Sequence, residues 1–233
     1  QITIDGINDI YNKIKNYIYK DSNAFERIMN NIEQLLSKNI YVNARLNFNP
    51  VNIEPTLNTI DYLYNRFKDN ELLCVYVAWL NGEKIPTPMD YTKDNNPQLT
   101  LIKKLLDYNY IVDIEDLGIA PYLYGCAALQ DDFAVIGTEG NLYKCEHSVM
   151  DEESDSFGNI FTMKIDQNNI KKWEFNDYPY EECYECQLLP SCQGGCKYAA
   201  LNSEKKYVCS PLKNCLKEAL YLFYNKKFKE KGE

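Results

Sequence analysis

The chain has 233 residues, of which 45% are hydrophobic, and it carries a formal net charge of −9 at pH 7. That length is enough for one large or two modest domains with a buried core. The acidic balance argues against a nucleic-acid partner, because phosphate groups are bound by clustered Lys and Arg. A membrane partner is not expected either, since the longest apolar run, residues 72–80, is far shorter than the ~20 residues of a membrane-spanning helix.

Strand and helix signals alternate over about the first hundred residues, which predicts βα units on a parallel sheet. Residues 1–5 alternate polar with apolar side chains and end at Gly6, as a strand does before a turn. Ser22 is a candidate N-cap for a helix with apolar residues every three or four positions. Those apolar positions are Phe25, Ile28, Met29, Ile32, Leu35 and Leu36.

Residues 40–48 predict a second strand with two different faces. One face holds apolar side chains, and the other holds Asn43, Arg45 and Asn47. Such a strand fits the wall of a barrel, with helices over the apolar side and a polar lumen on the other. The polar face is therefore expected to line the inside of a barrel.

Three further elements follow before the composition changes. Pro55 fits the first turn of a helix, and the inner face of that helix is expected to contain Leu57, Ile60, Leu63 and Phe67. Residues 72–80 predict a nearly all-apolar strand, and residues 81–98, which include three prolines, predict a long loop. A helix is expected over residues 99–106.

From about residue 118 the alternation stops, and short strands, glycines and cysteines take over. The composition therefore predicts one domain over residues 1–117 and a second over residues 118–233. In the second domain, residues 133–137 and 141–145 flank Thr138-Glu139-Gly140, which predicts a hairpin. This hairpin would position the cysteine that ends its second strand.

Seven of the nine cysteines form one dense constellation in the second half of the chain. They are Cys126, Cys145, Cys183, Cys186, Cys192, Cys196 and Cys209. The two residues between Cys183 and Cys186 let both sulfur atoms bind one metal centre with little strain. Gly194-Gly195 lets the backbone approach a bulky inorganic core. Seven ligands exceed what one centre can hold, so the pattern predicts two metal sites.

Zinc is the alternative to iron–sulfur at these sites. Two tetrahedral zinc ions need eight ligands, and His147 would complete the set. However, only Glu146 separates His147 from Cys145, which is not the spacing usual in zinc knuckles. The spacing therefore favours iron–sulfur.

The chain is expected to close with a helix that Ser210 caps and Pro211 begins. Its apolar face would hold Leu212, Cys215, Leu216, Ala219, Leu220 and Phe223. Cys209 lies just ahead of that helix, where the helix dipole and free N–H groups favour a thiolate. Cys74 and Cys215 lie in apolar surroundings and are expected to be small core residues. We therefore choose Cys209 over Cys215 as the last metal ligand.

The cysteine pattern, with Gly140-Asn141-Leu142-Tyr143-Lys144-Cys145 and Gly158-Asn159-Ile160, resembles a SPASM domain. This domain is the C-terminal auxiliary-cluster module of radical S-adenosylmethionine (SAM) enzymes, and the resemblance covers roughly residues 118–215. More weakly, Gln1-Ile2-Thr3-Ile4-Asp5-Gly6 resembles the strand ending in Ser-x-Asp-Gly in the partial barrel of the same enzymes. The implied fold is an α/β remnant of a partial (β/α) barrel, followed by a small, irregular α+β, cysteine-rich cluster-binding domain.

Position by position, the resemblance implies two auxiliary [4Fe–4S] clusters. Cys126, Cys145 and Cys196 would hold the nearer cluster. Cys183, Cys186, Cys192 and Cys209 would hold the farther one. Relatives with full ligation have a further cysteine shortly before Cys126, whereas this chain has Ala120-Pro121-Tyr122-Leu123-Tyr124 there. The nearer cluster would then have an open iron for a substrate thiol or amide.

The resemblance also implies that SAM lies in the lumen of the complete enzyme, against Thr3, Asp5, Asn43 and Arg45. Lys15 stands where relatives carry an arginine, which removes the planar bidentate fork. Glu146 occupies the place of an acidic proton acceptor in sulfatase-maturing relatives, and a solvated turn carboxylate is the alternative. No residue is assigned a catalytic role.

Radical SAM chemistry also needs a Cys-x3-Cys-x2-Cys loop, and the chain has none, because Ala199 stands where the third cysteine would follow Cys196. In the family that loop precedes the strand at Gln1, so we expect a C-terminal fragment with an unpaired strand edge at residues 1–5. This chain alone is then not expected to cleave SAM.

The leading hypothesis is part of a radical SAM/SPASM enzyme that modifies a peptide or protein, giving a thioether crosslink or an oxidised residue. A reductant such as ferredoxin or flavodoxin and a well-reduced cytoplasm are implied with it. The alternatives are a non-catalytic iron–sulfur or electron-transfer module and a zinc-stabilised structural domain.

Overall fold

The structure is a computed structural model in two compact units, Gln1–Ile119 with Pro211–Glu233, and Ala120–Ser210. No helix in the part of the chain that it describes is both long and apolar enough to cross a membrane. The described residues are 1–18, 23–50, 53–68, 70–80, 91–111, 113–119, 126–150, 155–174, 180–202 and 208–229.

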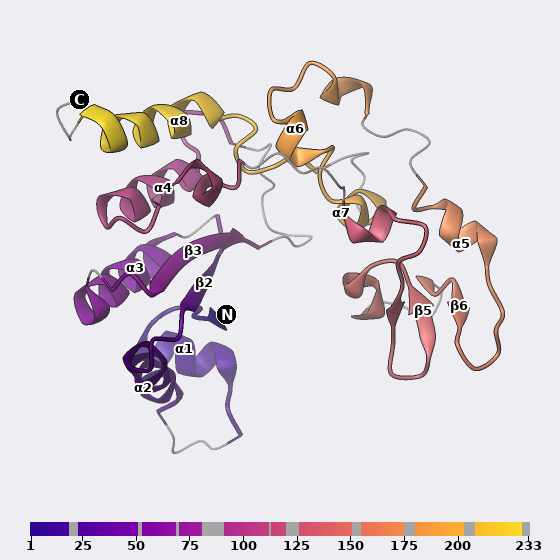
Figure 1. The fold of residues 1–233 in the computed structure, drawn as a ribbon, viewed down its shortest axis with the longest axis horizontal. Coiled ribbons are helices and arrows are strands. Elements are labelled where there is room, and N and C mark those ends of the chain that lie inside the picture. Colours follow the sequence, from indigo (N-terminus) through magenta and orange to yellow (C-terminus); the bar gives the residue numbers. More distant parts are fainter. Residues whose placement is uncertain are drawn as a thin grey trace. The chain divides into compact units, whose positions relative to one another are not determined.

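The first unit is built on a three-stranded parallel sheet with strand order β1-β2-β3 (Figure 1). This arrangement confirms the predicted βα units. The described residues close no barrel, so the partial-barrel assignment stays a prediction. The elements of this unit are β1 (Ile2–Thr3), α1 (Asn8–Lys15), α2 (Ala24–Ser37), β2 (Val42–Phe48), α3 (Glu54–Phe67), β3 (Leu73–Trp79), α4 (Pro97–Asp107), η2 (Ile114–Leu117), α8 (Leu216–Tyr224) and the π-helical turn η7 (Asn225–Lys229).

The central strand β2 has the two faces that its sequence predicts. Val42, Ala44, Leu46 and Phe48 are buried, whereas the residues between them are only half-buried. Helices α2 and α3 both contact β2, and they contribute fully buried side chains to the core. These side chains include Phe25, Met29, Ile32, Ile60 and Leu63. The inner face predicted for α3 is confirmed at Ile60 and Leu63, while Leu57 and Phe67 are half-buried.

Helix α2 begins with a side-chain cap. The Asn23 side chain accepts a hydrogen bond from the Glu26 backbone N–H (3.2 Å), which satisfies one of the otherwise unpaired amides of the first turn. The predicted cap, Ser22, lies outside the described residues. Asn12 of α1 adds two hydrogen bonds to this end of α2. It accepts one from the Phe25 N–H (2.8 Å) and donates one to the Asn23 side chain (3.2 Å). Helix α1 was not predicted from the sequence.

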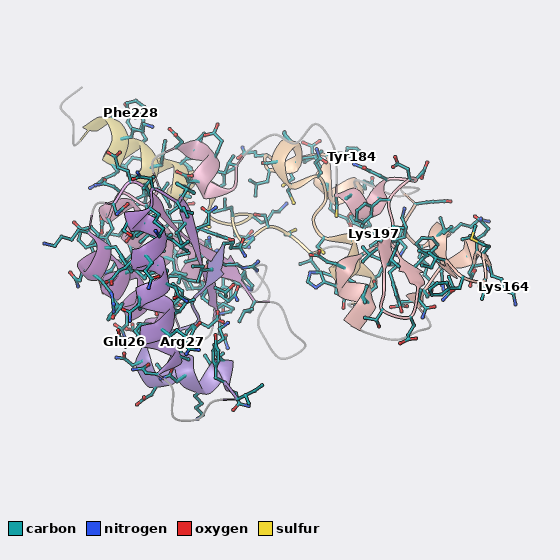
Figure 2. The ribbon with its side chains drawn as sticks, turned by 60° about the horizontal axis from the view of Figure 1, so that its bottom comes forward. Glu26, Arg27, Lys164, Tyr184, Lys197 and Phe228 are labelled. Carbon is teal, nitrogen blue, oxygen red and sulfur yellow. The ribbon has the colours of Figure 1, made fainter. Side chains whose placement is uncertain are left out.

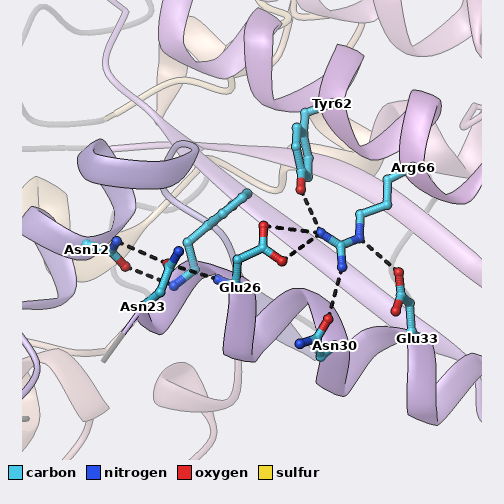
Figure 3. A network of polar contacts seen from close by, with 8 residues as sticks. Asn12, Asn23, Glu26, Asn30, Glu33, Tyr62 and Arg66 are labelled. Atoms are coloured by element: carbon cyan, nitrogen blue, oxygen red, sulfur yellow. Dashed lines mark hydrogen bonds and ion pairs between the residues drawn. The ribbon is translucent and has the colours of Figure 1, made fainter. Parts of the chain in front are cut away.

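Arg66 of α3 joins that helix to α2. Of the neighbouring α2 residues labelled in Figure 2, Glu26 faces Arg66, while Arg27 is exposed. The Arg66 guanidinium donates to Glu33 (2.9 Å), Glu26 (3.1 Å), Asn30 (3.0 Å) and the Tyr62 hydroxyl (2.7 Å) (Figure 3). All of these partners except Tyr62 come from α2. The planar fork therefore fixes the distance and register between the two helices.

The second unit contains a three-stranded antiparallel sheet with order β4-β5-β6. The predicted hairpin is confirmed as β4 and β5, with Val135 opposite Tyr143, and β6 adds a strand that was not predicted. The elements of this unit are η3 (Ala127–Leu129), β4 (Val135–Ile136), β5 (Asn141–Tyr143), η4 (Glu146–Met150), β6 (Gly158–Asn159), α5 (Gln167–Lys171), η6 (Glu181–Cys183), α6 (Leu189–Cys192) and α7 (Lys197–Leu201).

The predicted start of the closing helix is wrong. Helix α8 begins at Leu216 with Cys215 at its N-cap, not at Pro211 with Ser210 as the cap. The preceding turn is held by the Asn96 side chain, which donates to the Pro211 carbonyl oxygen (3.2 Å). Helix α8 then packs beside α4 (Figure 1). The closing segment therefore belongs to the first unit, whereas the composition had placed it in the second domain.

Candidate metal centres

All seven predicted cysteine ligands lie in the second unit, Ala120–Ser210. None of the nine cysteines forms a disulfide bond in the described part of the chain. Among the described residues, no three His, Cys, Asp or Glu side chains are grouped in a way that could hold a metal ion. Free thiols are therefore the right kind of ligand for a thiolate-bound metal. However, the described residues do not bring enough of them together to form a complete ligand set.

Of the three cysteines assigned to the nearer cluster, Cys126 and Cys196 both lie within electrostatic range of Cys145. Cys126 precedes η3, Cys145 follows β5, and Cys196 is the N-cap of α7. Burial raises the pKa of the Cys145 thiol, and negative charge on Cys196 and on Cys126 raises it further. Charges act in this way only over short distances. Three parts of the sequence that are far apart therefore come within electrostatic range of Cys145, although the described residues form no three-ligand group there.

Backbone amides point at two of these sulfur atoms. The backbone N–H groups of His147 and Ser148 lower the pKa of the Cys145 thiol, which opposes the other effects, and the Ser148 N–H also donates to the Cys145 carbonyl oxygen (3.1 Å). The sulfur atom of Cys196 accepts a hydrogen bond from the Ala199 N–H at 3.5 Å. Such donors stabilise the thiolate, which is the form that binds a metal.

The cysteines assigned to the farther cluster lie on consecutive turns. The Cys186 N–H donates to the Cys183 carbonyl (2.9 Å), and the Gly195 N–H donates to the Cys192 carbonyl (3.0 Å). Cys183 is buried, while Cys186, Cys192 and Cys209 are half-buried. Short spacing and these turns keep the first three cysteines close along the chain.

The two remaining candidates around Cys145 behave differently from metal ligands. The His147 ring stacks against Tyr198, with ring centroids 5.2 Å apart and an angle of 28° between the ring planes. The Glu146 side chain is exposed in η4, as the solvated-carboxylate alternative requires. The described residues assemble neither the zinc arrangement that includes His147 nor a closed iron–sulfur ligand set, so both stay predictions.

Cys215 is a core residue, as predicted. It is fully buried, and its thiol donates to the Pro211 carbonyl oxygen (3.6 Å). Burial, with a contribution from the charge of Glu218, raises its pKa to about 11. Cys74 is only half-buried, and burial raises its pKa too, while a hydrogen bond with the Tyr41 side chain lowers it.

Three of the residues predicted to bind SAM share one face of the first sheet. Thr3 lies opposite Arg45 in the β1–β2 register, and Tyr76 follows on β3. Asn43 lies two positions before Arg45 on the same face of β2. The Arg45 Nε donates to Asn47 (2.9 Å), and the Tyr76 hydroxyl donates to the side-chain carbonyl of Gln1 (2.7 Å). We call this row of half-buried polar side chains the polar face.

Asp5, the fourth predicted residue, pairs with Lys15. The Lys15 ammonium lies 2.8 Å from one carboxylate oxygen, Oδ2. The other oxygen, Oδ1, is buried and has no hydrogen-bond partner among the described residues. A buried carboxylate oxygen without a donor is costly. A ligand N–H or O–H group would satisfy it.

A cavity of about 350 Å³ runs along β3 in the first unit. It is bounded by β3, α4 and η2, and it includes Cys74 and Tyr76 of β3. The buried side-chain oxygen of Gln98 on its wall has no partner among the described residues. A small molecule of modest size would fit this volume.

Sequence reasoning missed Lys144, which is only 4% exposed. Its ammonium donates to the backbone carbonyls of Gln130 and Phe133, the latter at 3.0 Å. Nothing in the local pattern indicated this burial, because the partners lie more than ten residues away.

No family model, curated protein or solved structure matches this chain. The case for its function therefore depends on its own residues and their arrangement.

Proposed function

We propose that this chain is the cluster-binding part of a radical SAM/SPASM enzyme that modifies a peptide or protein, and that it binds two auxiliary [4Fe–4S] clusters. One observation carries the proposal. Cys126, Cys145 and Cys196 belong to three separate elements, yet contacts join the segments that carry them: Lys144 donates to the Phe133 carbonyl (3.0 Å), and the His147 and Tyr198 rings lie 5.2 Å apart. The resemblance assigns this same trio to one cluster.

The chain's own residues have two tasks in this proposal. The seven cysteines supply thiolates, and the amides of His147, Ser148 and Ala199 stabilise two of the sulfur atoms. When bound, a [4Fe–4S] cluster supplies one-electron transfer and, at an iron without a protein ligand, a place for a substrate thiol or amide. Hydrogen bonds to the sulfur atoms would help to set its potential.

The polar face would contact SAM in the complete enzyme. Thr3, Asn43 and Arg45 supply hydroxyl, amide and guanidinium groups on one face of the sheet, and the buried oxygen of Asp5 offers an acceptor. The chain contains no Cys-x3-Cys-x2-Cys loop, so SAM cleavage is not proposed for it alone. A ferredoxin or flavodoxin as reductant and a reduced cytoplasm complete the proposal.

Anaerobic reconstitution of the 233-residue chain with iron and sulfide tests this function. Two clusters of four iron atoms predict a brown protein with about eight iron and eight sulfide atoms per chain. Cys145→Ser and Cys186→Ser should each lose about half of the iron, because each removes a ligand of a different cluster. Cys74→Ser is the matched control and should keep all of it.

The zinc alternative has a different signature. A colourless protein with about two zinc atoms and no sulfide would reject the iron–sulfur proposal in favour of a structural domain. Removing that zinc with a chelator should then unfold the second unit.

A non-catalytic iron–sulfur module is the second candidate, and it predicts that the natural gene also lacks a Cys-x3-Cys-x2-Cys loop. Both candidates predict the same iron content, so reconstitution does not separate them. Reading the natural gene upstream of Gln1 does, because a loop encoded there supports the enzyme and its lack supports the module.

A further inference from the structure

We propose that Lys144 and the His147–Tyr198 ring pair are positioning residues that hold together the chain segments bearing Cys126, Cys145 and Cys196 before any metal binds. The identity of the metal rests on the proposed function, whereas the joining of these three segments does not. Each of the two devices connects a different pair of cysteines.

Lys144 connects Cys126 with Cys145. Cys126 is the N-cap of η3, and its carbonyl accepts a hydrogen bond from the Leu129 N–H (2.9 Å). The chain then continues to Gln130 and Phe133, whose carbonyls accept from the Lys144 ammonium. Lys144 directly precedes Cys145. The ammonium therefore holds the loop after Cys126 against the end of β5.

The burial of Lys144 makes this connection specific. A lysine is almost never this deeply buried unless its ammonium is paired or hydrogen-bonded. Removing either carbonyl from its place would leave a buried charge poorly solvated. The loop after Cys126 is therefore not free to move away from β5 without a large cost.

The ring pair connects Cys145 with Cys196. His147 lies two residues after Cys145, and Tyr198 lies two residues after Cys196. Their rings are 5.2 Å apart and 28° from parallel, which is within the range of favourable aromatic pairs. The contact therefore brings η4 and α7 together at the two cysteines.

Cys183, Cys186 and Cys192 of the farther site need no such devices. The spacings between Cys183, Cys186 and Cys192 are short, and local turns already keep them together. The nearer trio closes loops of 19 residues, from 126 to 145, and 51 residues, from 145 to 196. Closing longer loops costs more conformational entropy. Loss of the devices should therefore harm the nearer site and spare the farther one.

The metal-free, reduced full chain tests the arrangement by crosslinking with dibromobimane, which joins two neighbouring thiols. Peptide mapping by mass spectrometry should find Cys126–Cys145 and Cys145–Cys196 links in the unaltered chain. Lys144→Met, which keeps the length but removes the charge, should lose most of the Cys126–Cys145 link. Tyr198→Ala should lose most of the Cys145–Cys196 link, and Tyr198→Phe should retain it, because the ring remains.

Two matched controls lie in the same unit and are labelled in Figure 2. Lys164 and Tyr184 are exposed, so Lys164→Met and Tyr184→Ala should leave every link unchanged. The Cys183–Cys186 link is the internal reference within each variant. Its loss together with the others would overturn the proposal, because the residues would then hold the whole unit and not this site.

Metal binding gives a second readout. In a Cys186→Ser background, which removes the farther site, Lys144→Met should weaken iron retention against a chelator by about tenfold, as partners outside a ligand set commonly do. Unchanged links in Lys144→Met and Tyr198→Ala would overturn the positioning role and leave the proposed function standing. Intact links in a chain that takes up no iron would reject the proposed function alone.

Discussion

The carbonyl oxygen of Val208 lies against Gly195 so closely that a β-carbon on Gly195 would be 2.0 Å from it. Gly195 also has a φ of +86°, which residues with a side chain rarely adopt. The contact brings the segment before Cys196 against the segment before Cys209. A ligand assigned to the nearer cluster is thus tied to one assigned to the farther cluster. The approach of Gly194-Gly195 to an inorganic core stays a prediction, and the close approach that the structure shows is between Gly195 and the Val208 backbone.

Gly195→Ala should destabilise the second unit, because the new methyl group cannot coexist with the Val208 backbone. The loss should exceed the about 1–2 kcal/mol that the left-handed conformation alone costs a residue with a side chain. Urea unfolding followed by Trp173 fluorescence measures it. Trp173 is one of two tryptophans and is buried in this unit, so a Trp79→Phe background isolates its signal.

Gly118→Ala is the matched control for that substitution. Gly118 has a φ of +73° but nothing within 4 Å of its would-be β-carbon. Only the backbone cost of about 1–2 kcal/mol is then expected, measured through Trp79 in the first unit. If Gly195→Ala and Gly118→Ala lower the free energy of unfolding equally, the Val208 contact adds nothing to the cost of the Gly195 substitution.

Stability at alkaline pH should depend on Cys215. Its folded pKa of about 11 lies above the ordinary value of 9.0, so the folded state holds its proton longer than the unfolded state. The free energy of unfolding is therefore unaffected below pH 9.0 and falls between pH 9.0 and about 11, by up to about 1.4 kcal/mol per pH unit. Urea unfolding of the chain and of Cys215→Ala across this range measures the difference.

The alanine variant should be flatter with pH than the unaltered chain. The variant is less stable at every pH because it lacks the buried sulfur. The test is therefore how steeply the free energy of unfolding changes with pH, and not how far apart the two curves lie. Parallel curves for the two proteins would contradict a buried, protonated thiol at Cys215.

Iron content should distinguish Cys209 from Cys215 as the last ligand. Cys215 is fully buried in the first unit, whereas Cys209 is half-buried in the unit that holds the other six candidates. Cys209→Ser should therefore lose about half of the iron, as expected for one of two clusters, and Cys215→Ala should retain it. The reverse result would assign Cys215 as the ligand.

Arg66→Met should destabilise the first unit by about 1 kcal/mol, because partly exposed charged hydrogen bonds are weakened by solvent. The Arg66 side chain is 20% exposed and pairs with Glu26 and Glu33. Urea unfolding through Trp79 measures the loss, and molar salt should shrink it by screening the ion pairs. Arg27→Met, on the exposed side of α2, should change stability little.

Much of the first unit could be predicted from the sequence because its signals are periodic. The two-residue alternation of β2 and the recurrence of apolar residues in α2 depend only on neighbours along the chain. Helix α1 escaped prediction because it is short and rich in Asn and Lys, and its Asn12 finds its partners in α2. The local Ser-Pro signal misplaced the start of α8, which begins at Leu216, and the Pro211 carbonyl oxygen instead accepts a long-range hydrogen bond from Asn96.

The sequence by itself determined which side chains are available: seven closely spaced cysteines, a polar strand face and a glycine pair. Which of them meet was decided only by the tertiary structure, since Lys144 reaches Phe133 and His147 reaches Tyr198 across long stretches of chain. The physical reason is that the spacing of apolar residues along the chain indicates only which side chains face the core. The partner of a buried ammonium or a stacked ring is distant in sequence, and only the fold brings the two together. Spacing therefore indicates the chemistry of the centres, and packing gathers their ligands.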